Sequence, residues 1–162
     1  MTATGVHVRP AEPDDVAFIV SLIRGLADYE KLSDQVEASE SLLADHLFGD
    51  RRYAEALIGE RDGARSGYAL FFHSYSTFLT KPGIYLEDLY VEPDQRGHGI
   101  GRALLSRIAG LAVERGCGRV EWAVLDWNEP AIGFYRSLGA APVQGWTTYR
   151  LAGEALQSFA GG

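Results

Sequence analysis

Residues 85–116 read YLEDLYVEPDQRGHGIGRALLSRIAGLAVERG, which combines a strand-like segment, a glycine-rich turn and a helical pattern. The aromatic and branched side chains of residues 85–91 favour a buried β-strand. After a polar break, Ile100, Leu104 and Ile108 recur at helical spacing, so we expect a helix with one buried face. A strand that passes through a tight turn into a helix is typical of α/β proteins.

Three glycines, Gly97, Gly99 and Gly101, mark the turn before that helix. The first N–H groups of a helix are unpaired and carry a partial positive charge, so bare backbone there can bind phosphate. Two common phosphate motifs do not match. Arg102 stands where a dinucleotide-binding motif needs its third glycine, and Arg102 and Ala103 stand where a Walker loop needs lysine and a hydroxyl residue. An ordinary strand-to-helix turn remains the alternative interpretation of these glycines.

The composition is that of a soluble globular domain. The chain has 162 residues, of which 46% are hydrophobic and 23% charged, so we expect one domain spanning residues 1–162. No apolar run is long enough to cross a membrane, and the first residues do not resemble a signal peptide. The single cysteine, Cys117, excludes an intramolecular disulfide and favours a cytoplasmic location. The net charge of −7 disfavours nucleic acid and anionic membranes as partners and favours a small cationic substrate.

The other elements follow from periodicity, turn residues and helix caps. We expect, in chain order, a strand at 6–9, a helix from Pro13 to about Tyr29, a helix at 39–48 with Leu42, Leu43 and Leu47 inward, a hairpin of strands 53–60 and 67–75, a loop at 77–83, a strand at 119–125, a helix capped by Asn128, a strand at 144–151 and a helical tail at 154–159. This order of elements indicates an α/β fold.

Two motifs carry a resemblance to a known family. RGHGIG at residues 96–101 resembles the pyrophosphate loop of the GNAT acetyltransferase superfamily, Arg/Gln-x-x-Gly-x-Gly/Ala. WNEPAIGFYRSLGA at residues 127–140 resembles the superfamily's Asn-x-x-Ala-x-x-Phe-Tyr signature. With IRGLADYEKLSDQV at residues 23–36, the chain looks most like the spermidine/spermine (diamine) N-acetyltransferases. The resemblance implies the GNAT fold, a mixed, mostly antiparallel central sheet with helices on both faces and a splayed pair of central strands. It also implies a homodimer.

The resemblance further implies that acetyl-CoA is the acetyl donor. Arg96 is expected to shape the glycine turn rather than to hold phosphate. The implied contacts are Leu89, Tyr90 and Val91 along the pantetheine, Gly97, His98, Gly99, Ile100, Gly101 and Arg102 on the pyrophosphate, and Asn128, Glu129, Pro130 and Ala131 on the same arm.

Acetyl transfer from a thioester to an amine needs a base and an acid. An alkyl amine with a pKa of about 10.4 is almost entirely protonated at neutral pH, so a carboxylate must bind the cation and accept its proton. Glu87 and Asp88 are adjacent on the expected strand, so their side chains should point to opposite faces. The resemblance assigns Glu87 as the base and Tyr135 as the acid that protonates the leaving thiolate. The alternatives are a solvated edge residue at Glu87 and a packed aromatic at Tyr135.

The implied substrate contacts point to a cationic amine, with one departure from the polyamine enzymes. Those enzymes carry an acid and a tryptophan in the loop before the strand at residues 85–91 and a glutamate near the last strand, whereas this chain has Ser76, Phe78 and Gln144 there. We therefore expect a shorter or singly cationic amine, such as a lysine analogue. The histidines lack metal-ligand spacing, so no metal site is expected. The implied substrate contacts are Tyr29, Glu30, Glu87, Asp88, Glu121, Trp122 and Ala123.

Two other functions remain open at this stage. A protein or peptide acetyltransferase could use the same glycine turn, but it would need an open groove for a polypeptide. A regulatory module could bind acyl-CoA without turnover, but it would have no use for both Tyr135 and Glu87.

Overall fold

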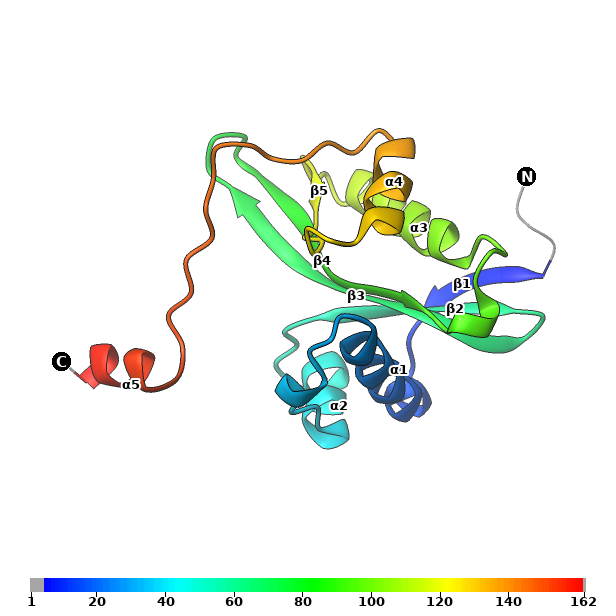
Figure 1. Ribbon diagram of the computed structural model, residues 1–162, viewed down its shortest axis with the longest axis horizontal. Coiled ribbons are helices and arrows are strands. Elements are labelled where there is room, and N and C mark those ends of the chain that lie inside the picture. Colours follow the sequence, from blue (N-terminus) through cyan, green and yellow to red (C-terminus); the bar gives the residue numbers. More distant parts are fainter. Residues whose placement is uncertain (1–4, 162) are drawn as a thin grey trace. The chain divides into compact units, whose positions relative to one another are not determined.

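A computed structural model describes residues 5–161 of the chain. Within these residues a sheet has the strand order β1-β2-β3-β4-β5, and neighbours are antiparallel except for the parallel pair β4 and β5 (Figure 1). The mixed, mostly antiparallel sheet predicted from the sequence is therefore confirmed. The strands are β1 (Val6–Pro10), β2 (Glu55–Arg61), β3 (Ala64–Ser76), β4 (Lys81–Val91) and β5 (Val120–Glu121).

The chain divides into two compact units, Met1–Ala123 and Val124–Gly162. The first unit contains the sheet and the first three helices, and the second contains the last two. The helices are α1 (Val16–Tyr29), α2 (Glu40–Phe48), α3 (Ile100–Glu114), α4 (Glu129–Ser137) and α5 (Gly153–Gly161), and short 3-10 turns lie at Pro13–Asp15, Ser33–Gln35 and Pro93–Gln95.

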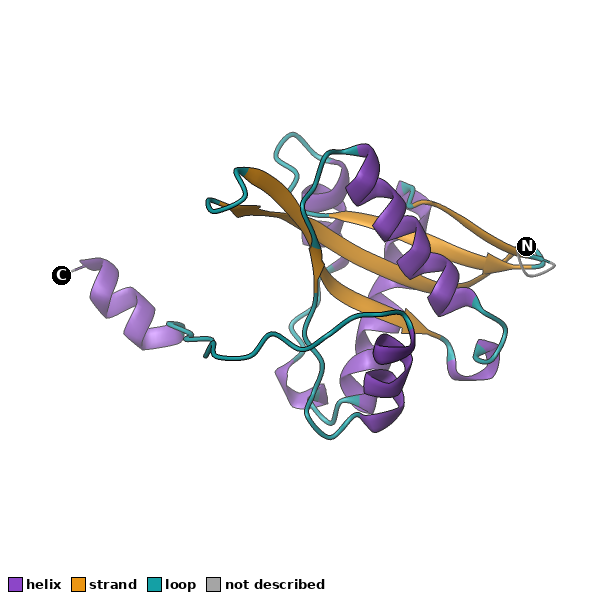
Figure 2. Cartoon of the chain, turned by 90° about the horizontal axis from the view of Figure 1, so that it is seen from above, coloured by secondary structure: helices purple, strands orange, loops and turns teal. Residues whose placement is uncertain are grey.

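Helices cover both faces of the sheet in the first unit, as predicted. The helices α1 and α2 lie under one face, where Ile19 of α1 and Leu47 of α2 pack in one buried cluster with Ile58 of β2 (Figure 1). The long helix α3 lies across the strands on the other face (Figure 2). A side chain at Gly59 of β2 would place its Cβ 2.7 Å from the Cγ2 of Ile100, so this glycine lets α3 approach the sheet closely.

Two predicted details in the first half of the chain are wrong. Leu42 is 58% exposed, while Leu47 of the same helix is buried, because a short helix turns only a narrow stripe toward the core. The predicted loop at 77–83 is shorter than expected, since β4 already begins at Lys81 and pairs there with Ser76. Cross-strand pairing extends this hairpin beyond what local composition indicates.

Two predicted strands near the end of the chain also differ from the structure. Of the strand expected at 119–125, only Val120 and Glu121 are paired. The strand expected at 144–151 does not form, and Trp146 is 83% exposed and Tyr149 93% exposed there. Strand preference depends mainly on packing against neighbouring strands, so a strand-like sequence stays irregular where the described residues offer it no partner.

Candidate active site

A β-bulge interrupts β4 at the two acidic residues singled out from the sequence. Asp88 lies opposite Leu70 of β3 and Leu86 lies opposite Phe71, so Glu87 is an extra residue between the two pairs. A bulge breaks the regular alternation of side chains between the two faces of a sheet. The predicted placement of Glu87 and Asp88 on opposite faces assumes regular alternation, and the strand register does not keep regular alternation at this point.

Three carboxylates, those of Glu30, Glu87 and Asp88, form a group that we call the carboxylate cluster. Burial raises the pKa of Glu30, and the negative charges of Asp88 and Glu87 raise it further. Glu87 and Asp88 therefore both lie close enough to Glu30, the residue that follows α1, for their charges to raise its pKa. Acids that are desolvated and repel one another are stabilised when a cation enters among them. The cluster is suited to bind an ammonium group.

The buried tyrosine Tyr68 of β3 supports one member of this cluster. Its hydroxyl donates a hydrogen bond of 2.8 Å to the Oδ2 of Asp88. Burial raises the pKa of the Asp88 carboxyl, and this hydrogen bond lowers it. Tyr68 was not predicted as a site residue, because the predicted hairpin pairs its strand with residues 53–60, and only the structure shows that it also pairs with β4, where Tyr68 lies opposite Tyr90.

The glycine turn adopts a backbone that requires glycine at two positions. Gly97 has a φ of 82° and Gly99 a φ of 85°, both in the left-handed region. Gly99 precedes the first residue of α3, and among the described residues no side chain caps it. A Cβ at Gly97 would meet no atom within 4 Å, so the turn is open on that side. The start of α3 therefore presents bare backbone, as predicted for a phosphate site.

Arg96 anchors this turn to the end of β4 and to the end of α1. Its Nε donates a 3.1 Å hydrogen bond to the carbonyl oxygen of Val91. Its guanidinium carbon lies 5.2 Å from the centre of the Tyr90 ring and 5.4 Å from that of the Tyr29 ring, in the range of cation–π contacts. These contacts agree with the predicted role of Arg96 in shaping the turn. They also bring Tyr29, an implied substrate residue, next to the implied cofactor loop.

The strands β4 and β5 part soon after they meet. They pair only at Ile84 with Val120 and at Tyr85 with Glu121, whereas β4 continues to Val91. Within the described residues, the stretch from 86 to 91 therefore lacks a strand partner on the β5 side, which is the splay that the fold class implies. Leu89, Tyr90 and Val91 lie on this unpaired stretch.

Of the three substrate residues implied near β5, Glu121 lies in the strand and the other two follow it. The Oε1 of Glu121 lies 3.0 Å from the Nε of Arg119, which partly neutralises its charge. Burial raises the pKa of Tyr85, and the charges of Glu87 and Glu121 raise it further. The charge of Glu121 therefore reaches Tyr85 of β4, as does the charge of Glu87 from the carboxylate cluster. Trp122 and Ala123 lie in irregular chain after β5.

In the second unit, α4 begins with the predicted cap. Asn128 is 7% exposed, and its side-chain oxygen accepts a 3.4 Å hydrogen bond from the backbone N–H of Ala131. Glu129 and Pro130 complete the first turn. Tyr135 lies near the end of α4, half-buried, with its ring centre 5.7 Å from that of Phe134.

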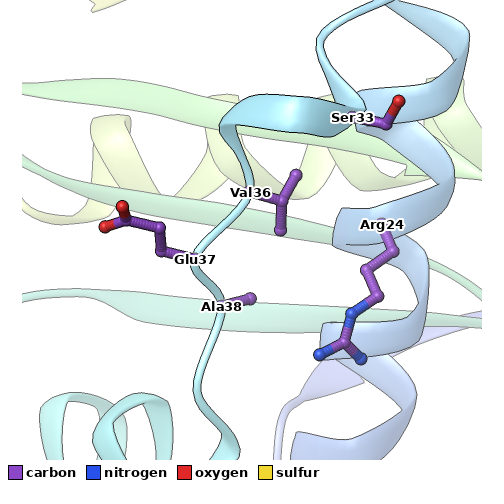
Figure 3. Close-up of a pocket in the computed structure, with 5 residues that line it drawn as sticks. All are labelled: Arg24, Ser33, Val36, Glu37 and Ala38. Carbon is purple, nitrogen blue, oxygen red and sulfur yellow. The ribbon is translucent and has the colours of Figure 1, made fainter.

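A separate cavity of about 410 Å³ lies beside α1 (Figure 3). Arg24 of α1 lines one side of it, and Ser33, Val36, Glu37 and Ala38 of the following segment line the other. None of these residues belongs to the implied cofactor or substrate contacts. The cavity therefore adds nothing to the assignment of the reaction.

Residues 5–161 contain neither a metal-binding group of side chains nor a membrane-spanning helix. In this part of the chain no three His, Cys, Asp or Glu side chains come together in a way that could hold a metal ion. No helix of this part combines the length and the apolar character needed to cross a membrane.

Known proteins resemble this chain over nearly its whole length. Thialysine N-epsilon-acetyltransferase from Bos taurus is 41% identical over 167 residues, covering 96% of this chain and 98% of that protein. L-ornithine N5-acetyltransferase from Arabidopsis thaliana is 33% identical, covering 94% of this chain and 87% of that protein. Among solved structures, an integron cassette protein from the mobile metagenome of V. cholerae matches with a TM-score of 0.78 and 25% identity, covering 97% of this chain and 98% of that chain.

The family model of the GNAT acetyltransferases matches residues 21–140, which include the carboxylate cluster, the glycine turn and α4. The resemblance inferred from the two sequence motifs is thereby confirmed. The chain belongs to the GNAT family of acetyltransferases and is an acyltransferase.

Proposed function

We propose that the protein transfers an acetyl group from acetyl-CoA directly to the primary amine of a small cationic molecule of the lysine type, such as thialysine. The observation that carries this proposal is the carboxylate cluster beside the glycine turn of a GNAT enzyme. The names of the relatives support the substrate class, since thialysine and ornithine are both short amino acids with a terminal amine.

The residues that depart from the polyamine pattern favour this substrate over spermine. The Ser76 hydroxyl accepts a 3.2 Å hydrogen bond from the backbone N–H of Leu79, so it serves the β3–β4 hairpin. Phe78 at the tip of that hairpin is 99% exposed. Neither residue supplies the negative charge that a distant second ammonium group would need. A polyamine remains the second candidate, because a spermidine/spermine N(1)-acetyltransferase-like protein from Homo sapiens is 31% identical in a match that covers 95% of this chain and 24% of that protein.

Acetyl-CoA fits the backbone features of the site. The uncapped start of α3 and the open side of Gly97 would receive the pyrophosphate on residues 97–102. The stretch of β4 at Leu89, Tyr90 and Val91 pairs with β3 but has no strand partner on its β5 side within the described residues, and the backbone groups on that side would receive the pantetheine. We assign the first turn of α4, from Asn128 to Ala131, to the same arm of the donor.

The amine must lose a proton before it can attack. For an amine with a pKa of about 10.4, deprotonation at pH 7 costs roughly 4.6 kcal/mol. We propose that Asp88 and Glu30 bind the ammonium group and that Glu87, the exposed member of the cluster, accepts its proton directly or through water. The amine nitrogen then forms a bond to the acetyl carbon.

The carbon–sulfur bond breaks as the amide forms, and the departing thiolate needs a proton. We assign this proton to the Tyr135 hydroxyl, and the second proton that the attacking nitrogen loses as it becomes an amide restores the phenol through water. A thiol with a pKa of about 8.5 and a phenol with a pKa of about 10 differ by roughly 2 kcal/mol, which a well-aligned hydrogen bond can offset. The acetyl group passes directly to the amine, and no covalent enzyme intermediate is involved.

We further propose that the protein acts as a cytoplasmic homodimer. The single cysteine favours the cytoplasm. Large apolar side chains of the second unit are exposed, including Val143, Trp146 and Phe159. Aromatic side chains such as Trp146 and Phe159 are enriched in the contacts between protein subunits. Sedimentation velocity would measure the mass in solution, and a monomer at micromolar concentration would rule out this assembly.

The proposed function predicts a clear order among amines. We expect mass spectrometry to detect monoacetylated thialysine, and kcat/KM for thialysine, lysine or ornithine to exceed that for spermine by about tenfold or more, because a second distant charge finds no acid. The panel should include putrescine, spermidine and a lysine-containing peptide. If no amine is acetylated, the proposed function is wrong; a preference for the peptide would instead favour a protein acetyltransferase.

A further inference from the structure

We propose that Tyr68 is a positioning residue of the amine site, holding one carboxylate oxygen of Asp88 so that the other remains available to the substrate ammonium. This inference rests on the proposed function, since it concerns the same carboxylate cluster.

The geometry carries the proposal. Tyr68 is 0% exposed and packs in the core cluster with Ile19 and Leu22 of α1. It lies opposite Tyr90 in the sheet register, so Asp88 is its diagonal neighbour on the next strand. The hydroxyl reaches the Asp88 Oδ2 at 2.8 Å. A phenylalanine would fill the same space without a polar group to satisfy, so the buried hydroxyl serves Asp88 rather than the packing.

The groups around Asp88 come from three elements. Glu30 at the end of α1 lies close enough for the charge of Asp88 to raise its pKa, Tyr68 reaches Asp88 from β3, and Glu87 and Tyr90 lie on the same strand as Asp88. Burial raises the pKa of Asp88, and the hydroxyl of Tyr68 lowers it. Removal of the hydroxyl would leave the effect of burial unopposed, so Asp88 would take up a proton at a higher pH. A protonated Asp88 no longer attracts an ammonium group.

Tyr68 itself cannot act as the base or the acid. Burial and then the charge of Asp88 raise its pKa far above the ordinary value, so it remains a hydrogen-bond donor at every working pH. Because its side chain is fully buried, it does not reach the substrate. It acts through Asp88 alone.

The test is the variant Tyr68→Phe, measured by the pH profile of kcat/KM for the amine between about pH 5 and pH 9. We expect the acidic limb of the profile to move up by about one pH unit, and KM for the amine to rise about tenfold at low pH, since one hydrogen bond to a charged group is lost. KM for acetyl-CoA should not change. Tyr75→Phe, on the same strand but with an exposed side chain, is the matched control and should keep the wild-type profile.

The variant Asp88→Asn provides a second test, in combination with Tyr68→Phe. If Tyr68 acts through Asp88, adding Tyr68→Phe to Asp88→Asn should change kcat/KM by less than about twofold, because the two effects are not additive. A folded Tyr68→Phe variant with the wild-type pH profile and amine KM would overturn the proposal, and so would additive effects in the double variant.

A readout that does not depend on activity separates this proposal from the proposed function. Carbon-13 NMR of the labelled Asp88 carboxyl should give a higher pKa in Tyr68→Phe than in the wild type, whether or not any amine is acetylated. An unchanged carboxyl pKa would refute the role of Tyr68 alone, whereas an inactive wild type with a shifted carboxyl pKa would refute only the function proposed above.

Discussion

Replacing Tyr135 with phenylalanine is expected to lower kcat by about 100- to 10,000-fold while the affinity for acetyl-CoA stays within about twofold of wild type. The expectation follows from the chemistry of the leaving group. Without a proton donor, the transferred acetyl group leaves a bare thiolate, which competes with the amine for the acetyl carbon. The hydroxyl makes its contribution only as the carbon–sulfur bond breaks, so its removal should affect kcat rather than binding.

Turnover measurements and calorimetry would separate the effect of Tyr135→Phe on catalysis from its effect on acetyl-CoA binding. Turnover is measured with saturating thialysine, and the dissociation constant of acetyl-CoA is measured by isothermal titration. Tyr149→Phe is the matched control, because Tyr149 belongs to the same unit, is 93% exposed and lies outside α4. Wild-type turnover in Tyr135→Phe would show that another group protonates the thiolate, and Tyr135 would then be a packed neighbour of Phe134.

The second large effect is expected for Glu87→Gln. Loss of the base should lower kcat/KM by about 100-fold at pH 7, and the deficit should shrink as the pH rises. The reason is that the free amine fraction grows about tenfold per pH unit until the pH approaches the amine pKa of about 10.4. At high pH the variant no longer needs a base and should approach the wild-type rate.

The pH profiles of Glu87→Gln and Asp88→Asn would distinguish the roles of the two acids in the bulge. Asp88→Asn should raise KM for the amine and remove the acidic limb that protonation of Asp88 produces, but it should not show the pH-dependent recovery expected of Glu87→Gln, because Asp88 binds the cation and does not take its proton. Glu37→Gln, in the cavity of Figure 3, is the control and should match the wild type. A deficit in Glu87→Gln that is the same at every pH would remove Glu87 as the base.

Local sequence determined the elements that carry the glycine turn and the cap of α4. The helical spacing of Ile100, Leu104 and Ile108 predicted the buried face of α3, and all three side chains are buried. The left-handed backbone at Gly99 and the capping oxygen of Asn128 were also predictable. Each of these features depends on residues within about one helical turn of one another, so the sequence contains the whole interaction.

Tertiary structure alone decided how the acids of the site are arranged. Glu87 became an extra residue because β3 and β4 pair in a register that no local pattern fixes. Tyr68, which donates a hydrogen bond to Asp88, is far from it in the chain. Tyr29, which makes a cation–π contact with Arg96, lies at the end of a helix that is also distant in the chain. The strand expected at 144–151 does not form for a related reason. A strand needs a neighbouring strand to pair with, and the described residues offer this segment none.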